Sequence, residues 1–323
     1  LHEMGFENSI PVLDNTMELD HLLERIKGNL KVGIRVAIEQ EPQSAYYTSR
    51  LGIRPSEVIK YYKEKIARKK RVQVTMLHLF VDTGIRDTLY YWGEFKKAIK
   101  IFAELKKICP SLTALNIGGG FPISNNLSFE YDYKYMVDEI VSNIKAVCSQ
   151  EGIEEPDIYT EFGKYTVGES GATIFTVLEQ KQQNDSELWY LIDNSLMNTI
   201  PDSWGLNERF ILLPVNKWNN DFARVHIGGI SCDHSDYYNF EDLNQQVFLP
   251  TFKKDDEEPL YIGFFHTGAY QDAISGYGGI KHCLIPSPQH ILVDKDEKGN
   301  FIDTLWRPEQ RPNEMLQILG YDT

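Results

Sequence analysis

The sequence predicts an α/β protein in two parts, because the pattern of apolar and polar residues changes near residue 168. Before that point, short apolar runs alternate with amphipathic stretches, the pattern of parallel strands joined by crossover helices. After it, runs rich in β-branched and aromatic residues follow one another, separated by Asn, Asp, Gly and Pro clusters. We therefore expect part of a β/α barrel or a doubly wound sheet over residues 1–168. A mainly antiparallel β domain, of the β-sandwich or Greek-key kind, should follow over 169–323.

Five apolar runs mark the strands of the first part, and four amphipathic stretches mark its helices. The strand runs are "IPVLD" (10–14), "KVGIRVA" (31–37), "VTMLHLFV" (74–81), "LTALNIG" (112–118) and "PDIYTEF" (156–162). The apolar helix faces fall within 19–26, 58–66, 95–108 and 136–147. Helix starts are predicted at Asn15-Thr16 and at Pro55-Ser56, because these residue types favour the first positions of a helix.

Six runs mark the strands of the second part. They are "GATIFTVLEQ" (171–180), "LWYLID" (188–193), "RFILLPV" (209–215), "ARVHIGGI" (223–230), "LYIGFFH" (260–266) and "HILVD" (290–294). The one dense charge run, "FKKDDEEPL" (252–260), predicts a solvated surface turn.

The composition argues against several classes of function. The chain carries 33 basic and 47 acidic residues, and a net charge of -14 disfavours a general nucleic-acid or anionic-membrane partner. No apolar run reaches the roughly 18 residues of a membrane span, and no signal-peptide pattern opens the chain. The 4 cysteines lie far apart and the 8 histidines are scattered, so we expect no metal site and reduced thiols in the cytoplasm. The opening "LHEMGFENSI" has no initiator methionine in first position, and we expect further sequence upstream.

Two motifs follow predicted strands in the first part. "LNIGGGFP" (115–122) has three glycines whose backbone N–H groups could cradle a phosphate, although a ligand-free turn is an equal alternative. "TEFGKYTV" (160–167) places Glu161 and Lys164 at the carboxyl end of a strand, where β/α barrels bind ligands. The alternative for this pair is a surface ion pair at a domain joint.

Three motifs in the second part also carry chemistry. "IPDSWGL" (200–206) sets Asp202 beside Trp204 in a turn, which suits a cationic ligand or is an ordinary turn. "HTGAYQD" (266–272) offers Tyr270, which is also explained as a core tyrosine. "GGISCDHSDYY" (228–238) contains Cys232, either a thiol that handles protons or a small buried hydrophobe.

Five motifs, in this order, resemble those of the fold-type III pyridoxal-phosphate decarboxylases. They are "SRLGI" (49–53), "GGGF" (118–121), "EFGKY" (161–165), "CDHSD" (232–236) and "GAYQ" (268–271). Within that group, "PDSWG" followed by "RFILLPVN" is similar to the biosynthetic arginine decarboxylase branch. The resemblance spans nearly the whole chain and implies about strands 4 to 8 of a (β/α)8 TIM-like barrel, followed by the β domain.

The resemblance assigns a role to each motif. Glu161 matches the strand-end glutamate that holds the pyridine nitrogen of pyridoxal 5'-phosphate protonated in the family. Cys232 matches the cysteine that reaches across a dimer interface and donates a proton to the reacting carbon. The residues implied for cofactor binding are Gly118, Gly119, Gly120, Phe121, Lys164, Tyr270, Phe80 and Thr83, and those implied for substrate binding are Asp233, Asp202 and Asp236. The resemblance leaves open whether magnesium is used.

The chain departs from the family pattern in four places. The cofactor lysine lies on the family's first barrel strand, whereas this chain begins only around the fourth. Lys164 stands where the family usually has arginine, so a point charge replaces a planar fork. Phe80 stands where the family commonly has a stacking histidine, and His78 on the same strand face is either a substitute or a packed core residue. The helical insertion frequent in the arginine branch is missing around 168–190.

The resemblance implies decarboxylation of L-arginine to agmatine and carbon dioxide in polyamine biosynthesis. It also implies a cytoplasmic homodimer or larger assembly with a shared active site. Ornithine, lysine, diaminopimelate or carboxynorspermidine is an alternative substrate. A catalytically silent homologue that binds a partner is a second alternative, and a racemase, which would need a tyrosine base in place of Cys232, is a third.

Overall fold

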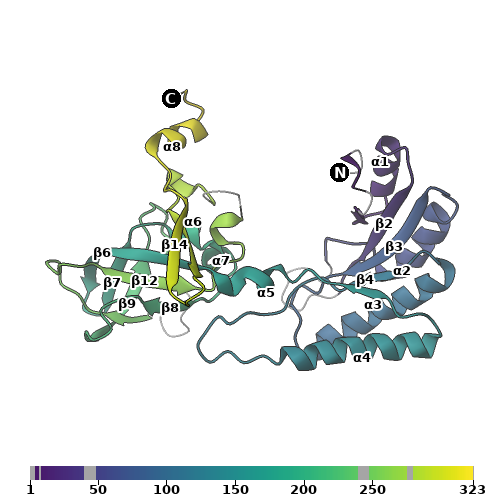
Figure 1. Ribbon diagram of the computed structural model, residues 1–323, viewed down its shortest axis with the longest axis horizontal. Helices are drawn as coiled ribbons and strands as arrows, with labels where there is room; N and C mark the ends of the chain where they lie inside the picture. Colours follow the sequence, from purple (N-terminus) through teal and green to yellow (C-terminus); the bar gives the residue numbers. More distant parts are fainter. Residues whose placement is uncertain (1–3, 7–8, 40–48, 239–246, 275–278, 323) are drawn as a thin grey trace. The chain divides into compact units, whose positions relative to one another are not determined.

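The computed structural model describes residues 4–6, 9–39, 49–238, 247–274 and 279–322. The chain divides into two compact units (Figure 1). The first consists of Leu1–Pro122 and Glu130–Tyr165, and the second of Ile123–Phe129 and Thr166–Thr323. The chain passes from the first unit to the second between Tyr165 and Thr166, whereas the boundary was expected after residue 168. Residues 123–129 also belong to the second unit, which was not predicted.

The first unit is built on a parallel sheet of five strands in the order β1-β2-β3-β4-β5. The strands are β1 (Val12–Leu13), β2 (Leu30–Val36), β3 (Val72–Leu79), β4 (Ala114–Asn116) and β5 (Asp157–Tyr159), so each predicted run overlaps one. A doubly wound sheet requires a reversal of strand order, whereas right-handed crossovers between sequential neighbours place every helix on one face. The order therefore indicates the barrel type of sheet.

Helices connect these strands. They are α1 (Glu18–Arg25), α2 (Pro55–Tyr61) with the π-helical turn η2 (Tyr62–Ile66), α3 (Leu89–Ile108) and α4 (Tyr133–Glu151). Helix α1 begins at Glu18, just after the predicted start at Asn15-Thr16, and Asn15 Oδ1 accepts the N–H of Met17 at 2.9 Å. Pro55 occupies the first turn of α2, as predicted. The apolar faces of these helices and one face of β2 and β3 form one hydrophobic core.

The second unit is built on a mainly antiparallel sheet in the order β10-β9-β7-β6-β12-β8, with β11 paired to β9. Its strands are β6 (Ala172–Asn184), β7 (Glu187–Ile192), β8 (Ile211–Pro214), β9 (Phe222–Gly228), β10 (Tyr237–Tyr238), β11 (Val247–Pro250) and β12 (Leu260–Phe265). The hairpin β13 (His290–Lys295) and β14 (Phe301–Arg307) and helix α8 (Pro312–Ile318) complete the unit (Figure 1). This sheet confirms the predicted β domain.

Three features of the second unit differ from expectation. β7 and β9 pair in parallel, although most neighbours in this sheet are antiparallel. The strands β10, β11 and β14 were not predicted. β10 has 2 residues and β11 has 4, too few to show a periodic pattern, and β14 mixes apolar with polar residues. Short helices α6 (Leu196–Thr199) and α7 (Pro201–Gly205) interrupt the strands, so the "PDSWG" stretch is a helical turn that begins with proline. Residues 253–259 are exposed, which confirms the predicted solvated turn.

Candidate functional site

A row of polar side chains crosses the carboxyl ends of the strands in the first unit. Arg35 of β2 pairs in register with His78 of β3, and His78 pairs with Asn116 of β4. Glu161 follows β5 after one intervening residue. Because the carboxyl ends of parallel strands share one edge of the sheet, the register brings together residues that are distant in the sequence. Of the four, only Glu161 was predicted as a site residue; Arg35 and Asn116 were missed, and His78 was left undecided.

The Glu161 carboxylate is oriented by its neighbours. Asn116 Nδ2 donates a hydrogen bond to Glu161 Oε1 at 2.8 Å, and Asn116 Oδ1 accepts the N–H of Gly118 at 2.9 Å. The backbone N–H of Glu161 in turn donates to the Gly118 carbonyl at 2.9 Å. The Glu161 side chain is still 51% exposed. A carboxylate that is held in place and partly open to solvent is suited to bind a ligand that donates a hydrogen bond.

His78 provides a weakly basic imidazole beside this carboxylate. Its Nε2 lies 3.5 Å from Glu161 Oε1, too long for a strong hydrogen bond. Burial lowers the pKa of His78; Glu161 opposes this shift and the Arg35 charge adds to it. The imidazole is therefore neutral at neutral pH. Neither of its ring nitrogens makes a hydrogen bond to the described part of the chain, so this buried histidine has unused polar atoms.

The glycine loop is fixed by close backbone contacts. A Cβ on Gly119 would lie 2.4 Å from the Glu161 carbonyl oxygen, and one on Gly118 would lie 2.7 Å from the Leu79 carbonyl oxygen. Gly120 has a φ of +113° and a Cβ there would lie 2.9 Å from Gly84 Cα. The glycines are thus required for the loop to pack between two strand ends. This requirement holds whether or not the loop also binds a phosphate.

The other predicted cofactor residues of the first unit lie in different surroundings. Phe80 is partly buried just after β3, with the Arg35 guanidinium carbon 5.9 Å from its ring centroid. Phe121 is buried among aromatic rings, 4.4 Å from the Phe162 centroid, which favours a packing role. Thr83 is half-buried in the loop after β3, and Lys164 is half-buried in the short helix α5 (Gly163–Val167).

Asp202 and Tyr270 occupy opposite environments in the second unit. The Asp202 side chain is buried, with 5% of the residue exposed, and Asp202 Oδ2 accepts a hydrogen bond from Gln271 Nε2 at 2.8 Å. Tyr270 is 55% exposed, in a left-handed turn with φ +63° that begins the 3-10 turn of Gln271–Ala273. Gln271 therefore links the two motifs that were predicted separately.

Asp236 acts as an anchor for its loop. Asp236 Oδ1 accepts the N–H of Leu196 at 2.9 Å, and Oδ2 accepts the N–H of Ser231 at 3.0 Å. A Cβ on Gly229 would lie 2.3 Å from this carboxylate, so only glycine fits there. Both carboxylate oxygens are thus engaged with backbone, which favours a structural role over the predicted contact with substrate.

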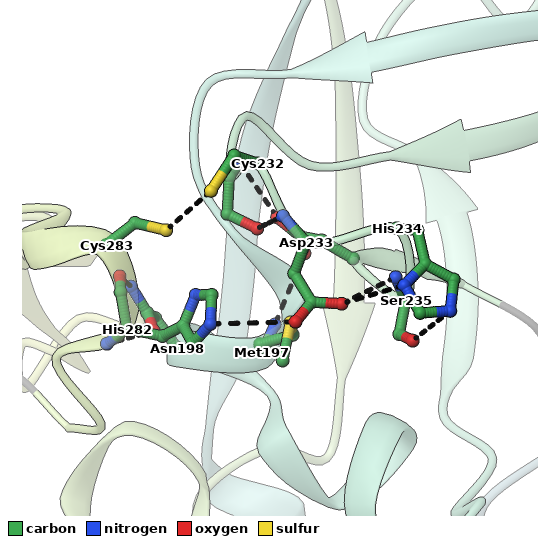
Figure 2. Close-up of polar contacts among 10 residues, drawn as sticks. Met197, Asn198, Cys232, Asp233, His234, Ser235, His282 and Cys283 are labelled. Atoms are coloured by element: carbon green, nitrogen blue, oxygen red, sulfur yellow. Dashed lines mark hydrogen bonds and ion pairs between the residues drawn. The ribbon is translucent and has the colours of Figure 1, made fainter.

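Cys232 and Asp233 are accessible on the same loop (Figure 2). The Cys232 thiol is exposed rather than buried, and its Sγ lies 3.5 Å from the Sγ of Cys283. The hydrogen bond with Cys283 raises the pKa of Cys232. Hydrogen bonding by the Ser235 backbone lowers the pKa of Asp233, whose Oδ2 lies 3.7 Å from His282 Nε2. At neutral pH this loop presents a protonated thiol next to a carboxylate anion.

Two kinds of feature are absent from the described residues. No helix among them has the length and the apolar character to cross a membrane. Nowhere in the described ranges do three or more His, Cys, Asp or Glu side chains gather as they would around a metal ion.

Comparison with known proteins gives a consistent result. The family model described as "Pyridoxal-dependent decarboxylase, pyridoxal binding domain" matches residues 4–168. The biosynthetic arginine decarboxylase of Prochlorococcus marinus (strain AS9601) is 20% identical and covers 98% of this chain, which spans 66% of that relative. The relative of the same name in Geotalea uraniireducens (strain Rf4) is 22% identical over 80% of the chain and 56% of its own length. The chain thus spans about two-thirds of the first of these curated relatives.

Solved structures show the same fold. The biosynthetic arginine decarboxylase of Campylobacter jejuni superposes with a TM-score of 0.79 at 22% identity, covering 99% of this chain and 67% of that one. Diaminopimelate decarboxylase of Helicobacter pylori, solved with L-lysine, superposes with a TM-score of 0.78 at 14% identity, covering 96% and 73%. At these identities the likeness concerns the fold alone.

Proposed function

We propose, from the premise that this chain belongs to the pyridoxal-dependent decarboxylases, that it serves the decarboxylation of a basic amino acid. L-Arginine, giving agmatine and carbon dioxide, is the leading reaction, because curated relatives over nearly the whole chain are named biosynthetic arginine decarboxylase. Ornithine, lysine and diaminopimelate are the competing substrates. The observation that carries the proposal is the Glu161 carboxylate held by Asn116 at the strand ends, with the neutral His78 beside it.

The residues present fit pyridoxal 5'-phosphate. Glu161 offers an oriented and partly exposed acceptor for the N–H of a pyridinium ring. His78 has buried ring nitrogens without hydrogen bonds in the described part of the chain, which a polar ligand would satisfy. Gly120 is the exposed member of the glycine loop, and Lys164 and Tyr270 are the further candidates for holding the phosphate. When bound, pyridoxal phosphate supplies an electron sink for the bond that breaks at the substrate's α-carbon.

The residues around Glu161 have different proposed roles. Asn116 fixes the carboxylate by a hydrogen bond, so Glu161 can hold a proton on a partner nitrogen without turning away. A neutral His78 adds no positive charge that would compete with that proton. Phe80 offers a ring face for stacking in the same region as the Arg35 guanidinium.

The second unit supplies the groups proposed for the substrate. Cys232 keeps its proton at neutral pH because its pKa is raised, as a proton donor at Sγ requires. Asp233 stays an anion because its pKa is lowered, and it is the proposed ligand of the substrate's distal cation, together with Asp202. A homodimer in which Cys232 serves the site of the second copy is part of the proposal.

Cofactor binding and turnover test the proposal in sequence. The purified full-length protein is titrated with pyridoxal phosphate by absorbance, then supplied with arginine, ornithine, lysine or diaminopimelate while carbon dioxide and the amine product are measured. We expect saturable binding that Glu161→Gln weakens and that the exposed control Glu64→Gln leaves unchanged. Agmatine should be the main product. Failure of the protein to bind pyridoxal phosphate would overturn the proposal. If a different amine is the main product, the amino acid from which it forms would replace arginine as the proposed substrate.

A further inference from the structure

We propose that Cys232 and Cys283 are a dithiol that forms a reversible disulfide, a modification site in the second unit. The consequence of this disulfide rests on the proposed function, because it removes the proton that Cys232 would donate. The two sulfur atoms lie 3.5 Å apart, and both cysteines are exposed (Figure 2). A disulfide bond is about 2.05 Å long, so the sulfur atoms have roughly 1.5 Å to close.

The loop of Cys232 is pinned to the start of helix α6. Asp236 accepts hydrogen bonds from Leu196 N at 2.9 Å and from Ser231 N at 3.0 Å, so its carboxylate ties the loop to α6 and closes the loop on itself. The N–H of Ile230 also donates to the Asn194 carbonyl at 3.2 Å. Cys232 is therefore carried by a short loop that is fixed on both sides.

The segment of Cys283 is pinned to the same place. Asn198 of α6 is buried; its Nδ2 donates to the His282 carbonyl at 3.0 Å and its Oδ1 accepts the His282 N–H at 3.1 Å. Asn194 Nδ2 donates to the Pro286 carbonyl at 3.4 Å. Residues 194–199 thus form one platform that holds both cysteine segments. The proximity of the thiols follows from these buried amide contacts.

The backbone dihedral angles at Cys283 indicate that surrounding contacts fix its conformation. Cys283 has φ +54° and ψ +18°, and Leu284 has φ +51°, so two consecutive residues with side chains occupy the left-handed region. Such conformations persist only where surrounding contacts determine them. The paired hydrogen bonds between Asn198 and His282 supply that constraint immediately before Cys283.

The other two cysteines provide an internal contrast. Cys109 is buried and its Sγ donates to the Val74 carbonyl at 3.5 Å, while Cys148 is buried in helix α4. Access and a partner thiol decide which cysteines a soluble oxidant modifies. Cys232 and Cys283 have both, so they should react before Cys109 and Cys148.

The reaction balances with a small-molecule disulfide such as oxidised glutathione. One cysteine thiolate attacks a glutathione sulfur and forms a mixed disulfide, and one glutathione thiolate leaves and takes up a proton. The second cysteine then attacks the first, the protein disulfide forms, and the second glutathione leaves. Two electrons pass to the oxidant, and two protons leave the protein. Because the pKa of Cys232 is raised, the reaction should become faster as the pH rises.

Mass spectrometry of the full chain tests the site independently of activity. The protein is equilibrated in glutathione buffers of increasing oxidised fraction, alkylated without unfolding, and analysed intact and as peptides. We expect a loss of roughly 2 Da, the two hydrogens removed, and a peptide that links Cys232 to Cys283. Cys148→Ser should behave as the parent protein. Cys283→Ser should instead carry glutathione on Cys232 with no internal link.

Two outcomes would overturn the inference, and a third result separates it from the proposed function. A parent protein that shows no link between Cys232 and Cys283 in fully oxidised buffer contradicts the site. A link that forms equally in the Cys283→Ser variant through another cysteine contradicts the assignment. Turnover is measured in parallel: activity lost on oxidation and restored by dithiothreitol supports a switch. Unchanged turnover in the linked protein would refute the role of Cys232 as proton donor, while the modification site would stand.

Discussion

His78 Nε2 lies 3.5 Å from Glu161 Oε1, which joins the third strand of the first unit to the residues that follow the fifth. The two side chains meet because the strands end at one edge of a parallel sheet. This contact sets a neutral imidazole against a carboxylate that Asn116 already holds.

Removing the amide of Asn116 should loosen the site. In Asn116→Leu, Glu161 loses its hydrogen-bond donor and the buried Gly118 N–H loses its acceptor, so we expect a loss of about 1–3 kcal/mol in unfolding free energy. Pyridoxal phosphate affinity should fall as well. Asn116→Asp keeps the acceptor for Gly118 but sets two carboxylates together, and should reduce affinity with a smaller loss of stability. Urea unfolding and cofactor titration measure the two effects; equal affinity in all three proteins would contradict the role of Asn116.

Stability should decline at acidic pH because of His78. Its folded-state pKa lies below the ordinary histidine value of 6.5, so the unfolded chain binds more protons as the pH falls below about 6.5. The contribution of His78 to stability is therefore fully present above that pH and is lost as the pH falls through the folded pKa. Urea unfolding from about pH 8 to about pH 5 should show a steeper decline in the parent protein than in His78→Gln. Parallel pH profiles would refute the buried, neutral state of His78.

A methyl group at Gly119 should displace the strand ends. The added Cβ would lie 2.4 Å from the Glu161 carbonyl oxygen, so Gly119→Ala should cost about 1–3 kcal/mol and weaken cofactor binding. Gly163→Ala is the matched control, because a Cβ at Gly163 has no neighbour within 4 Å. Denaturant midpoints measure the difference. A Gly119→Ala protein as stable as Gly163→Ala would show that the loop has room to move.

Replacing the Cys232 thiol should slow turnover. A general acid contributes roughly 10²–10⁴-fold, and the hydroxyl of Cys232→Ser is a far weaker acid than the thiol. We expect kcat with arginine to fall within that range while pyridoxal phosphate binding stays the same. Cys148→Ser removes a buried thiol elsewhere and serves as the control. An unchanged kcat and an unchanged product in Cys232→Ser would remove this residue from the mechanism.

Neutralising Asp202 should affect substrate more than cofactor. Asp202 is buried and already accepts a hydrogen bond from Gln271, so Asp202→Asn removes charge with little change of shape. We expect arginine to bind at least about tenfold more weakly, equivalent to 1.4 kcal/mol, with pyridoxal phosphate affinity unchanged. Calorimetric titration with each ligand distinguishes the two. Equal loss for both ligands would indicate that Asp202 supports the fold and does not bind the distal cation.

Some of the site could be read from single motifs. The three glycines and Glu161 stand beside apolar strand runs, so both the sharp turn and the strand-end carboxylate follow from residues that are close in the sequence. Cys232 and Asp233 likewise form one motif. Phe121 lies in the same glycine motif, yet its ring is buried among aromatic neighbours, because packing from α4 and from the segment after β5 decides where it points.

The sequence alone determined the strands and connecting helices of the first unit and the strands β6, β7, β8, β9, β12 and β13 of the second, because apolar periodicity and residues that begin helices act over a few positions. Tertiary structure decided which polar residues meet. The row of Arg35, His78 and Asn116 depends on strand register, which no single segment encodes. The approach of Cys283 to Cys232 depends on buried amides of residues 194–199 that hold two distant loops. Such contacts form only when the chain buries its polar groups and must satisfy their hydrogen bonds within the fold.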